Sequence, residues 1–288
     1  MIYTLFSGVD RRRSVEQGMG GPMENYGTVV ETEWLSPCMV RIVFDGEGLA
    51  RFEPTPFTDQ YVNALFVPDG APYGVPFDVD EARALEPAHR PRGRRYTVRA
   101  WDAERGRLTI DFVAHGDVGF AGRWAQRAQA GDRLQVLGPS GGYWPDPEAD
   151  WYLFAGDESA LPAIAASLEV VPPGKRSVVL AVVDSADHEI AMPAVDGLDL
   201  VWLHRSGAEQ PGDLLVDAVA ALDWPAGRVD VFVHGEAAEV RAVRRHLIAE
   251  RGIDREAASI SPYWRRGHDD EAWRQVKNQW IADQEADV

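Results

Sequence analysis

Cysteine is almost absent from this sequence: Cys38 is the only one among 288 residues. A single thiol excludes an internal disulfide, a zinc site built from paired thiolates and an iron–sulfur cluster held by cysteines. Apolar runs are short, and none approaches the ~18 residues that a membrane-spanning helix requires. The first apolar stretch precedes the arginines of the amino terminus, which is the reverse of a secretory signal. We therefore expect a cytoplasmic protein without membrane insertion, in which redox chemistry would need a bound carrier.

Positive charge is scarce as well, with 29 basic against 46 acidic residues, a net charge of -17 and a pI of about 4.8. This balance disfavours nucleic acid and anionic bilayers as partners. Arginines nevertheless gather in "RRYTVRAWD", residues 94–102, which favours a site for a small anion. Period-two alternation places Arg94 and Tyr96 on one face of a strand, and Arg95 and Thr97 on the other. A charged edge strand, protected from pairing with neighbours, is the alternative.

Several catalytic motifs are missing. The seven histidines are scattered without the H-E-x-x-H spacing of a zinc site, and no G-x-S-x-G segment indicates a nucleophile elbow. These absences disfavour hydrolases and predict no metal site. The G-x-G-x-x-G fingerprint is missing too, so a tight dinucleotide site of the usual kind is not expected.

The apolar pattern changes character along the chain. Short apolar runs separated by Gly, Pro and Asp predict an antiparallel β-barrel or sandwich in residues 1–140, and residues 138–147 form a Gly- and Pro-rich crossing. Strand-like and helical runs then alternate, which predicts an α/β domain with a parallel sheet over 148–267. In the tail, 268–288, two tryptophans and a valine at i, i+3 and i+7 predict an amphipathic helix.

Glycines lead into the one helix expected in the first half. "DFVAHGDVGFAGRW" places Gly116, Gly119 and Gly122 three residues apart, just before the helical run that Gly131 ends. Glycine lets a ligand approach the backbone, and a helix start offers unpaired N–H groups to an anion. Glycines that only turn the chain are the alternative.

The first helix of the second half begins differently. In "FAGDESALPAI", Asp157, Glu158 and Ser159 are expected to cap the helix, and their charge repels a pyrophosphate. A nicotinamide cofactor would thus bind weakly and transiently. Asp184, after the second strand, could accept hydrogen bonds from a ribose 2′-OH and favour NADH over NADPH, although such an aspartate is commonly a turn residue.

Six segments together resemble one family. The Arg94–Thr97 segment is similar to the R-x-Y-[ST] flavin motif of ferredoxin-reductase-like flavoproteins. With five further segments it resembles the siderophore-interacting proteins, or ferric-siderophore reductases, over roughly residues 27–267; these are "DFVAHG", "GFAGRWA", "GDESALPAI", "HGEAAEVRAVRRHL" and "PYWRRG". The resemblance implies FAD bound between an N-terminal β-barrel and a nicotinamide-binding-like α/β domain.

The resemblance also implies residue roles. Arg94 would pair with the phosphates of FAD, and Tyr96 and Thr97 would act in catalysis, Tyr96 against the isoalloxazine and Thr97 near its reactive N5. Further cofactor contacts would come from Asp111, Phe112, Val113, His115, Gly119, Ala121, Gly122, Trp124, Asp157, Ser159, Ala160, Asp184 and Trp264. Arg265 and Arg266 would attract an anionic chelate, with a solvated turn as the alternative.

Two positions depart from the family pattern. Gly122 replaces a Ser or Thr, which removes a hydroxyl contact to phosphate worth about 1 kcal/mol. Asn63 stands where lysine is frequent.

The implied activity is an oxidoreductase relay from NADH or NADPH through FAD to a ferric siderophore, releasing ferrous iron. The rivals are a flavoprotein coupled to ferredoxin and a siderophore-binding protein without catalysis. We expect a monomer or a weak dimer.

Overall fold

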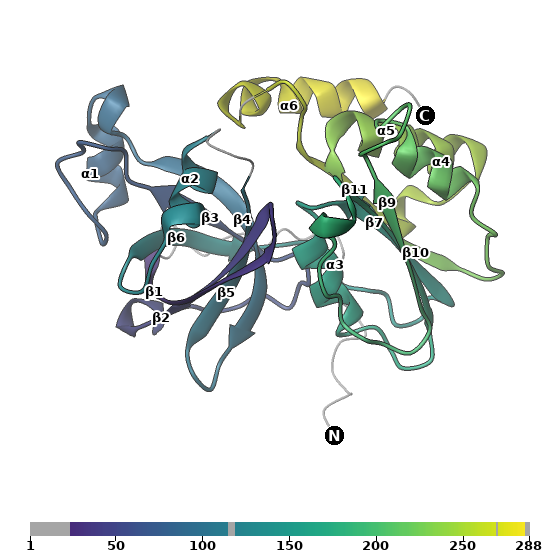
Figure 1. Cartoon of the computed structure of the whole chain (residues 1–288), viewed down its shortest axis with the longest axis horizontal. Helices are drawn as coiled ribbons and strands as arrows, with labels where there is room; N and C mark the ends of the chain where they lie inside the picture. Colours follow the sequence, from purple (N-terminus) through teal and green to yellow (C-terminus); the bar gives the residue numbers. More distant parts are fainter. Residues whose placement is uncertain (1–23, 115–118, 269, 286–288) are drawn as a thin grey trace.

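The computed structural model describes residues 24–114, 119–268 and 270–285. Figure 1 shows a β-barrel beside an α/β sheet, with helix α3 between them and helix α6 across the top. The predicted combination of barrel, parallel sheet and C-terminal helix is confirmed.

Six antiparallel strands close the barrel in the order β1-β2-β5-β4-β3-β6. They are β1 Glu24–Ser36, β2 Met39–Asp45, β3 Tyr61–Phe66, β4 Arg92–Asp102, β5 Arg107–Val113 and β6 Arg133–Ser140. Helices α1 (Val79–Ala84) and α2 (Phe120–Arg127) and short helical turns at Glu47–Leu49 and Pro87–His89 lie between strands.

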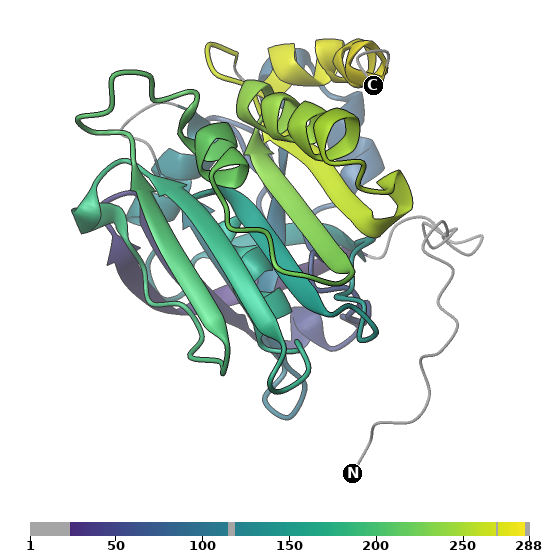
Figure 2. The ribbon, with the colours of Figure 1, turned by 90° about the vertical axis from the view of Figure 1, so that its right-hand side faces the viewer.

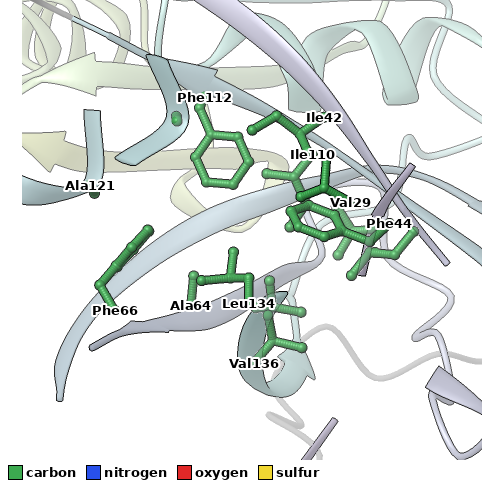
Figure 3. Close-up of a cluster of buried hydrophobic side chains, with 14 of the residues drawn as sticks. Val29, Ile42, Phe44, Ala64, Phe66, Ile110, Phe112, Ala121, Leu134 and Val136 are labelled. Carbon is green, nitrogen blue, oxygen red and sulfur yellow. The ribbon is translucent and has the colours of Figure 1, made fainter. Parts of the chain in front are cut away.

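Alternate side chains of each strand fill the barrel. Ile42 and Phe44 of β2 and Ile110 and Phe112 of β5 are 0–1% exposed, and Figure 3 shows them meeting inside. This period of two is what places one side of every strand on the core. The strand pattern of the sequence thus determines which residues of β4 and β5 can reach a ligand.

Five parallel strands form the second sheet in the order β11-β10-β7-β8-β9. They are β7 Trp151–Asp157, β8 Arg176–Val183, β9 Leu198–His204, β10 Val229–Glu236 and β11 Ala258–Trp264. The connecting helices are α3 Leu161–Leu168, α4 Leu214–Ala220 and α5 Ala237–Arg245, with helical turns at Ala186–His188, His246–Glu250 and Arg255–Ala257. Helices α4 and α5 cover the sheet face turned toward the viewer in Figure 2, and α3 packs on the opposite face.

Strand order reverses between β7 and β10, so the carboxyl ends of these two strands flank a topological switch point, where α/β sheets bind ligands. Two glycines let the strand ends approach. A Cβ on Gly156 would meet the His234 carbonyl oxygen, and one on Gly235, at φ +146°, would lie 2.7 Å from the Asp157 carboxylate. Larger residues there would push β7 and β10 apart.

The barrel and the sheet share buried contacts. Met39, at the start of β2, is fully buried in the same cluster as Leu161 of α3. On β4, Arg99 Nη2 lies 2.6 Å from Glu169 Oε1 beyond α3. The Thr97 hydroxyl hydrogen-bonds the Tyr263 phenol of β11. These contacts fix β4 against the carboxyl edge of the sheet.

The tail forms α6 (Asp270–Glu285), which packs on the α/β half. Trp273 and Trp280 are 2% and 9% exposed and lie against Ala237 of α5, while Val276 is 37% exposed. The predicted apolar face therefore consists of the two tryptophans without the valine. Among the described helices, none has the length and apolar composition needed to cross a membrane.

Candidate cofactor and substrate site

Strand β4 presents Arg94 and Tyr96 toward helix α2 and the barrel interior. The Arg94 guanidinium lies 4.2 Å from the centre of the Phe120 ring, and its Nη1 donates to the Gly93 carbonyl at 2.8 Å. The Tyr96 ring is 4.4 Å from that of Phe112. On the other face, the Arg95 guanidinium lies over Tyr61 at 5.2 Å, as the period-two pattern predicts.

The start of α2 lies next to Arg94 and is suited to an anion. Gly119 precedes the helix with φ +80°, a conformation that favours glycine, and the first turn contains no acidic residue. Ala121 and Gly122 are buried, and Arg123 Nε donates to the Gly119 carbonyl at 3.0 Å. Gly119 is exposed and Phe120 is half-buried, so the amino terminus of α2 is open to an anion beside the Arg94 guanidinium. Gly116 and His115 lie outside the described residues.

Four other predicted contact residues have side chains engaged within the protein. The Asp111 carboxylate, 3% exposed, accepts hydrogen bonds from Arg41 Nε at 2.7 Å and from Arg41 Nη2 at 2.8 Å. Phe112 is fully buried, and Trp124 packs in the same core cluster. Val113 packs against the apolar cluster of the α/β half. The Asp111 carboxylate and the Phe112 ring are therefore structural, which leaves their backbone for any contact with a cofactor.

A pocket of about 390 Å³ opens beside α2. Its walls carry three aromatic rings, three guanidiniums and two carboxylates, contributed by Phe66, Phe120, Trp124, Arg92, Arg123, Arg127, Asp69 and Asp132. The volume falls within the range of small-molecule sites. Phe120 lines this pocket, and the Arg94 guanidinium lies over the same ring.

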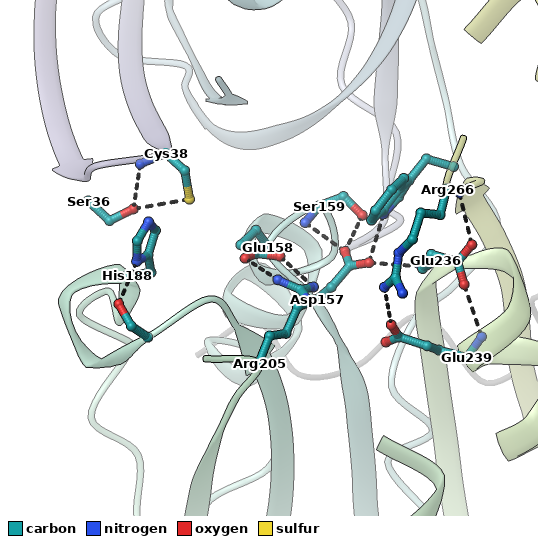
Figure 4. A network of polar contacts seen from close by, with 12 residues as sticks. Ser36, Cys38, Asp157, Glu158, Ser159, His188, Arg205, Glu236, Glu239 and Arg266 are labelled. Carbon is teal, nitrogen blue, oxygen red and sulfur yellow. Dashed lines mark hydrogen bonds and ion pairs between the residues drawn. The ribbon is translucent and has the colours of Figure 1, made fainter. Parts of the chain in front are cut away.

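A second group of polar residues lies at the carboxyl edge of the sheet, drawn in Figure 4. Asp157, 1% exposed, accepts hydrogen bonds from the Ser159 N–H at 2.9 Å, the Glu236 N–H at 2.8 Å and Trp264 Nε1 at 2.7 Å. Burial, and then the nearby charge of Glu158, raise the pKa of Asp157. Asp157 thus joins the ends of β7, β10 and β11.

The expectation that these residues cap α3 is wrong. The helix begins at Leu161 behind Ala160, and no side chain caps it. Glu158 instead forms a two-bond ion pair with Arg205, with N–O distances of 2.6 and 2.9 Å. Ala160 and Leu161 are fully buried, and Pro162 has no N–H group. The start of α3 is therefore closed to a pyrophosphate, which needs exposed N–H donors.

Arg266 is tied to the same edge. Its backbone N–H donates to Glu236 Oε1, and its Nη2 donates to Glu239 Oε1, both at 3.0 Å. Glu239 is 2% exposed, and burial followed by the nearby charge of Asp157 raises its pKa to about 7, even though Arg205 and Arg266 lower it. Burial outweighs the ion pair because the Arg266 side chain is 54% exposed, so water screens its charge.

Thr97 and Trp264 connect the β4 residues Arg94 and Tyr96 with the polar group around Asp157. Thr97, 8% exposed, follows Tyr96 on β4 and hydrogen-bonds Tyr263, the residue before Trp264. Arg265 follows Trp264 and forms no ion pair within the described part of the chain. Asp184 is exposed at the end of β8, and its backbone carbonyl accepts a hydrogen bond from the Ser206 N–H. Asp184 has no described contact with the Asp157 group.

Tyr263, Arg205 and Glu239 were not predicted as site residues. Tyr263 lies within "PYWRRG" and Glu239 within "HGEAAEVRAVRRHL", so both motifs were available, whereas Arg205 stands in a segment without a recognisable spacing. Across the described ranges, histidine, cysteine and carboxylate side chains form no group of three or more that could hold a metal ion.

The arrangement fits a flavin dinucleotide. Arg94 and the start of α2 lie between the Tyr96 ring on β4 and the pocket that Phe120 lines. No acidic side chain stands in the first turn of α2 to repel the phosphates. The described residues thus offer separate places for charge and for flat rings.

A closed antiparallel barrel followed by a parallel sheet of this order defines the ferredoxin-reductase-like fold. The ferredoxin reductase in carbazole 1,9a-dioxygenase shares this fold at 14% identity, with a TM-score of 0.62 over 84% of this chain and 68% of that one.

The chain belongs to the siderophore-interacting protein family. The family profile "Siderophore-interacting FAD-binding domain" matches residues 28–143, and "Siderophore-interacting protein" matches residues 149–267. A siderophore utilization protein from T. fusca has a TM-score of 0.76 and 36% identity, over 88% of this chain and 96% of that one.

Curated relatives cover nearly the whole chain. An uncharacterized protein of Mycobacterium tuberculosis is 42% identical over 93% of this chain and 98% of its own. Ferric vibriobactin reductase of Vibrio cholerae is 35% identical, over 86% and 92%. NADPH-dependent ferric-chelate reductase of Escherichia coli is 33% identical, over 82% and 91%.

Proposed function

We propose that this protein is an FAD-dependent oxidoreductase that passes electrons from NADH or NADPH to a ferric siderophore and so releases ferrous iron. The observation that carries the proposal is the seat at the start of α2, where Arg94 meets an acid-free helix turn beside Tyr96 in a protein of net charge -17. Relatives named ferric vibriobactin reductase and ferric-chelate reductase support the substrate class.

Each residue has a defined task in this proposal. Arg94 and the N–H groups that follow Gly119 bind the phosphates, and Tyr96 orients the ring system. The Thr97 hydroxyl would serve as a proton donor beside the reactive ring atom, and its hydrogen bond with Tyr263 would position it. When bound, the flavin accepts two electrons from the donor and passes them singly to ferric iron.

In this proposal the nicotinamide donor binds at the carboxyl edge of the sheet, where the start of α3 offers no site for its pyrophosphate. The closed start of α3 and the Glu158–Arg205 ion pair favour weak, transient nicotinamide binding. Asp184, exposed at the end of β8, would repel a 2′-phosphate and favours NADH, whereas the Escherichia coli relative is named for NADPH. A ferredoxin donor is the alternative that the same closed start favours.

The ferric chelate meets Arg265 in preference to Arg266. The Arg266 guanidinium pairs with Glu239, and its backbone N–H donates to Glu236. Arg266 therefore positions the segment that follows β11. Arg265 retains its charge beside Trp264 for an anionic chelate. A cytoplasmic location and a monomeric or weakly dimeric state belong to the same proposal.

An anaerobic two-stage experiment tests the function. Purified protein loaded with FAD is mixed with NADH, NADPH or reduced ferredoxin in turn, and the flavin absorbance is followed. Ferric siderophores of different charge are then added. We expect bleaching with a nicotinamide and recovery with an anionic ferric chelate. Bleaching by ferredoxin alone would favour the ferredoxin-coupled rival, and a protein that binds chelate but no flavin would favour sequestration without catalysis.

A further inference from the structure

Lys277 lies on the buried face of α6, between the two tryptophans that attach this helix. Trp273 is four residues before it and Trp280 three residues after it, so the three side chains share one face. Lys277 is half-buried, whereas the neighbouring Val276 is exposed. A charged group on such a face costs free energy unless it is paired. Apolar attachment of α6 would favour the valine at this place, so the lysine serves another purpose.

A backbone carbonyl near the end of β11 pairs with this lysine. Lys277 Nζ donates to the Pro262 carbonyl oxygen at 2.7 Å. Strand β11 is at the edge of the sheet, and Pro262 has no N–H group for the ladder. The pairing with β10 shifts register between Pro262 and Trp264, which leaves Tyr263 as an extra residue. Such a bulge redirects a side chain and is frequent beside active sites.

Tyr263 is the residue at this bulge, and its side chain is held from two directions. Its hydroxyl hydrogen-bonds Thr97 of β4. The edge of its ring meets the His234 ring, with the centres 4.8 Å and the planes 76° apart. His234 is 3% exposed, and its Nε2 lies 3.0 Å from Ser259 Oγ. Burial, and then the nearby charge of Lys277, lower the pKa of His234 to about 3, so this support for Tyr263 stays uncharged.

We propose that Lys277 is a positioning residue, which fixes the Pro262 carbonyl so that the bulge places the Tyr263 hydroxyl on Thr97. Helix α6 therefore supports the reaction site from outside the sheet and does not act as a gate. This inference rests on the proposed function, in which the Thr97 hydroxyl lies beside the reactive ring atom. The competing account is structural: Lys277 only attaches α6 to β11, and Tyr263 meets Thr97 without it.

Hydrogen exchange of the full-length, flavin-free protein tests the placement of the bulge. Lys277→Met removes the ammonium and keeps an unbranched side chain, and Gln279→Ala is the control because Gln279 bonds the exposed Asp283 on the same helix. We expect Lys277→Met to speed amide exchange at residues 263–266 about tenfold. Exchange in β7 and β10 should stay unchanged, as should all exchange in Gln279→Ala. Faster exchange confined to α6 would overturn the proposal in favour of the structural account.

A double-mutant cycle on the FAD-loaded protein tests the role in the reaction. The flavin is reduced anaerobically by light with a sacrificial tertiary amine, and its reoxidation by a ferric siderophore is timed. We expect Lys277→Met and Tyr263→Phe each to slow reoxidation at saturating chelate at least about tenfold, with half-saturation within about twofold of the wild type. The double variant should be no slower than Tyr263→Phe, and Lys277→Arg should restore most of the rate.

The outcomes of this cycle separate the two levels of the argument. Losses that multiply in the double variant, or a wild-type rate in Lys277→Met, would overturn the positioning role while the proposed function stands. A wild-type protein whose reduced flavin reacts with no ferric chelate would overturn the proposed function, and the role of Lys277 in it.

Discussion

Glu239→Gln is the change whose consequence follows most directly from the structure. Glu239 is almost fully buried at the carboxyl edge, and its pKa in the folded protein is about 7 against an ordinary value of 4.5. The folded state therefore holds the proton more tightly than the unfolded chain. Its contribution to stability is complete below pH 4.5 and is lost as the pH rises to 7.

The difference between the two pKa values corresponds to about 3 kcal/mol in the free energy of unfolding. Glutamine cannot ionise, and it keeps a carbonyl oxygen for Arg266. Between pH 4.5 and pH 7, the free energy of unfolding of the variant should therefore rise by about 3 kcal/mol relative to that of the wild type.

Urea unfolding, followed by tryptophan fluorescence at several pH values between 4.5 and 7, measures the effect. Glu104→Gln, in the exposed turn between β4 and β5, controls for the loss of a surface carboxylate. A difference between Glu239→Gln and wild type that stays constant within about 0.5 kcal/mol across the window would refute burial as the cause of the raised pKa.

Three further predictions concern other parts of the molecule. Arg94→Ala should weaken FAD binding by about 1.5 to 3 kcal/mol in a dialysis assay, and full retention of FAD would assign the phosphate contact to another arginine. Asp157→Ala leaves buried donors unpaired and should lower the free energy of unfolding by about 3 kcal/mol, whereas the exposed Asp184→Ala should cost less than about 0.5; equal costs in urea unfolding would contradict the network. Trp273→Ala should lower stability by about 3 kcal/mol in the same assay without faster turnover, and faster turnover in a still-folded variant would identify α6 as a gate.

Local patterns predicted most of the strands. The apolar runs at β2, β3, β5, β7, β8 and β10 are long enough to determine their elements, and the structure confirms them. No individual element was predicted at helix α1 or at strands β1, β6 and β11. Helix α1 has six residues, and β11 contains Pro262 and two serines, so pairing with β10 determines its conformation.

The carboxyl edge could not be derived locally. An Asp-Glu-Ser run before a helix is a typical capping sequence, yet Asp157 accepts from Glu236 and Trp264, which lie 79 and 107 residues further along the chain. Arg205 and Glu239 likewise gain their roles from residues distant in sequence. The β4 pattern succeeded because alternation along one strand already separates Arg94 from Arg95.

The most direct test of a flavin-dependent ferric reductase bypasses the donor. Protein loaded with FAD is reduced anaerobically by light in the presence of a sacrificial tertiary amine, which supplies the two electrons. It is then mixed with a ferric siderophore, and ferrous iron is trapped with a coloured chelator. Two ferrous ions should form for each reduced flavin as the flavin absorbance returns. A flavin that stays reduced, with no ferrous iron formed from any chelate, would contradict the proposed activity.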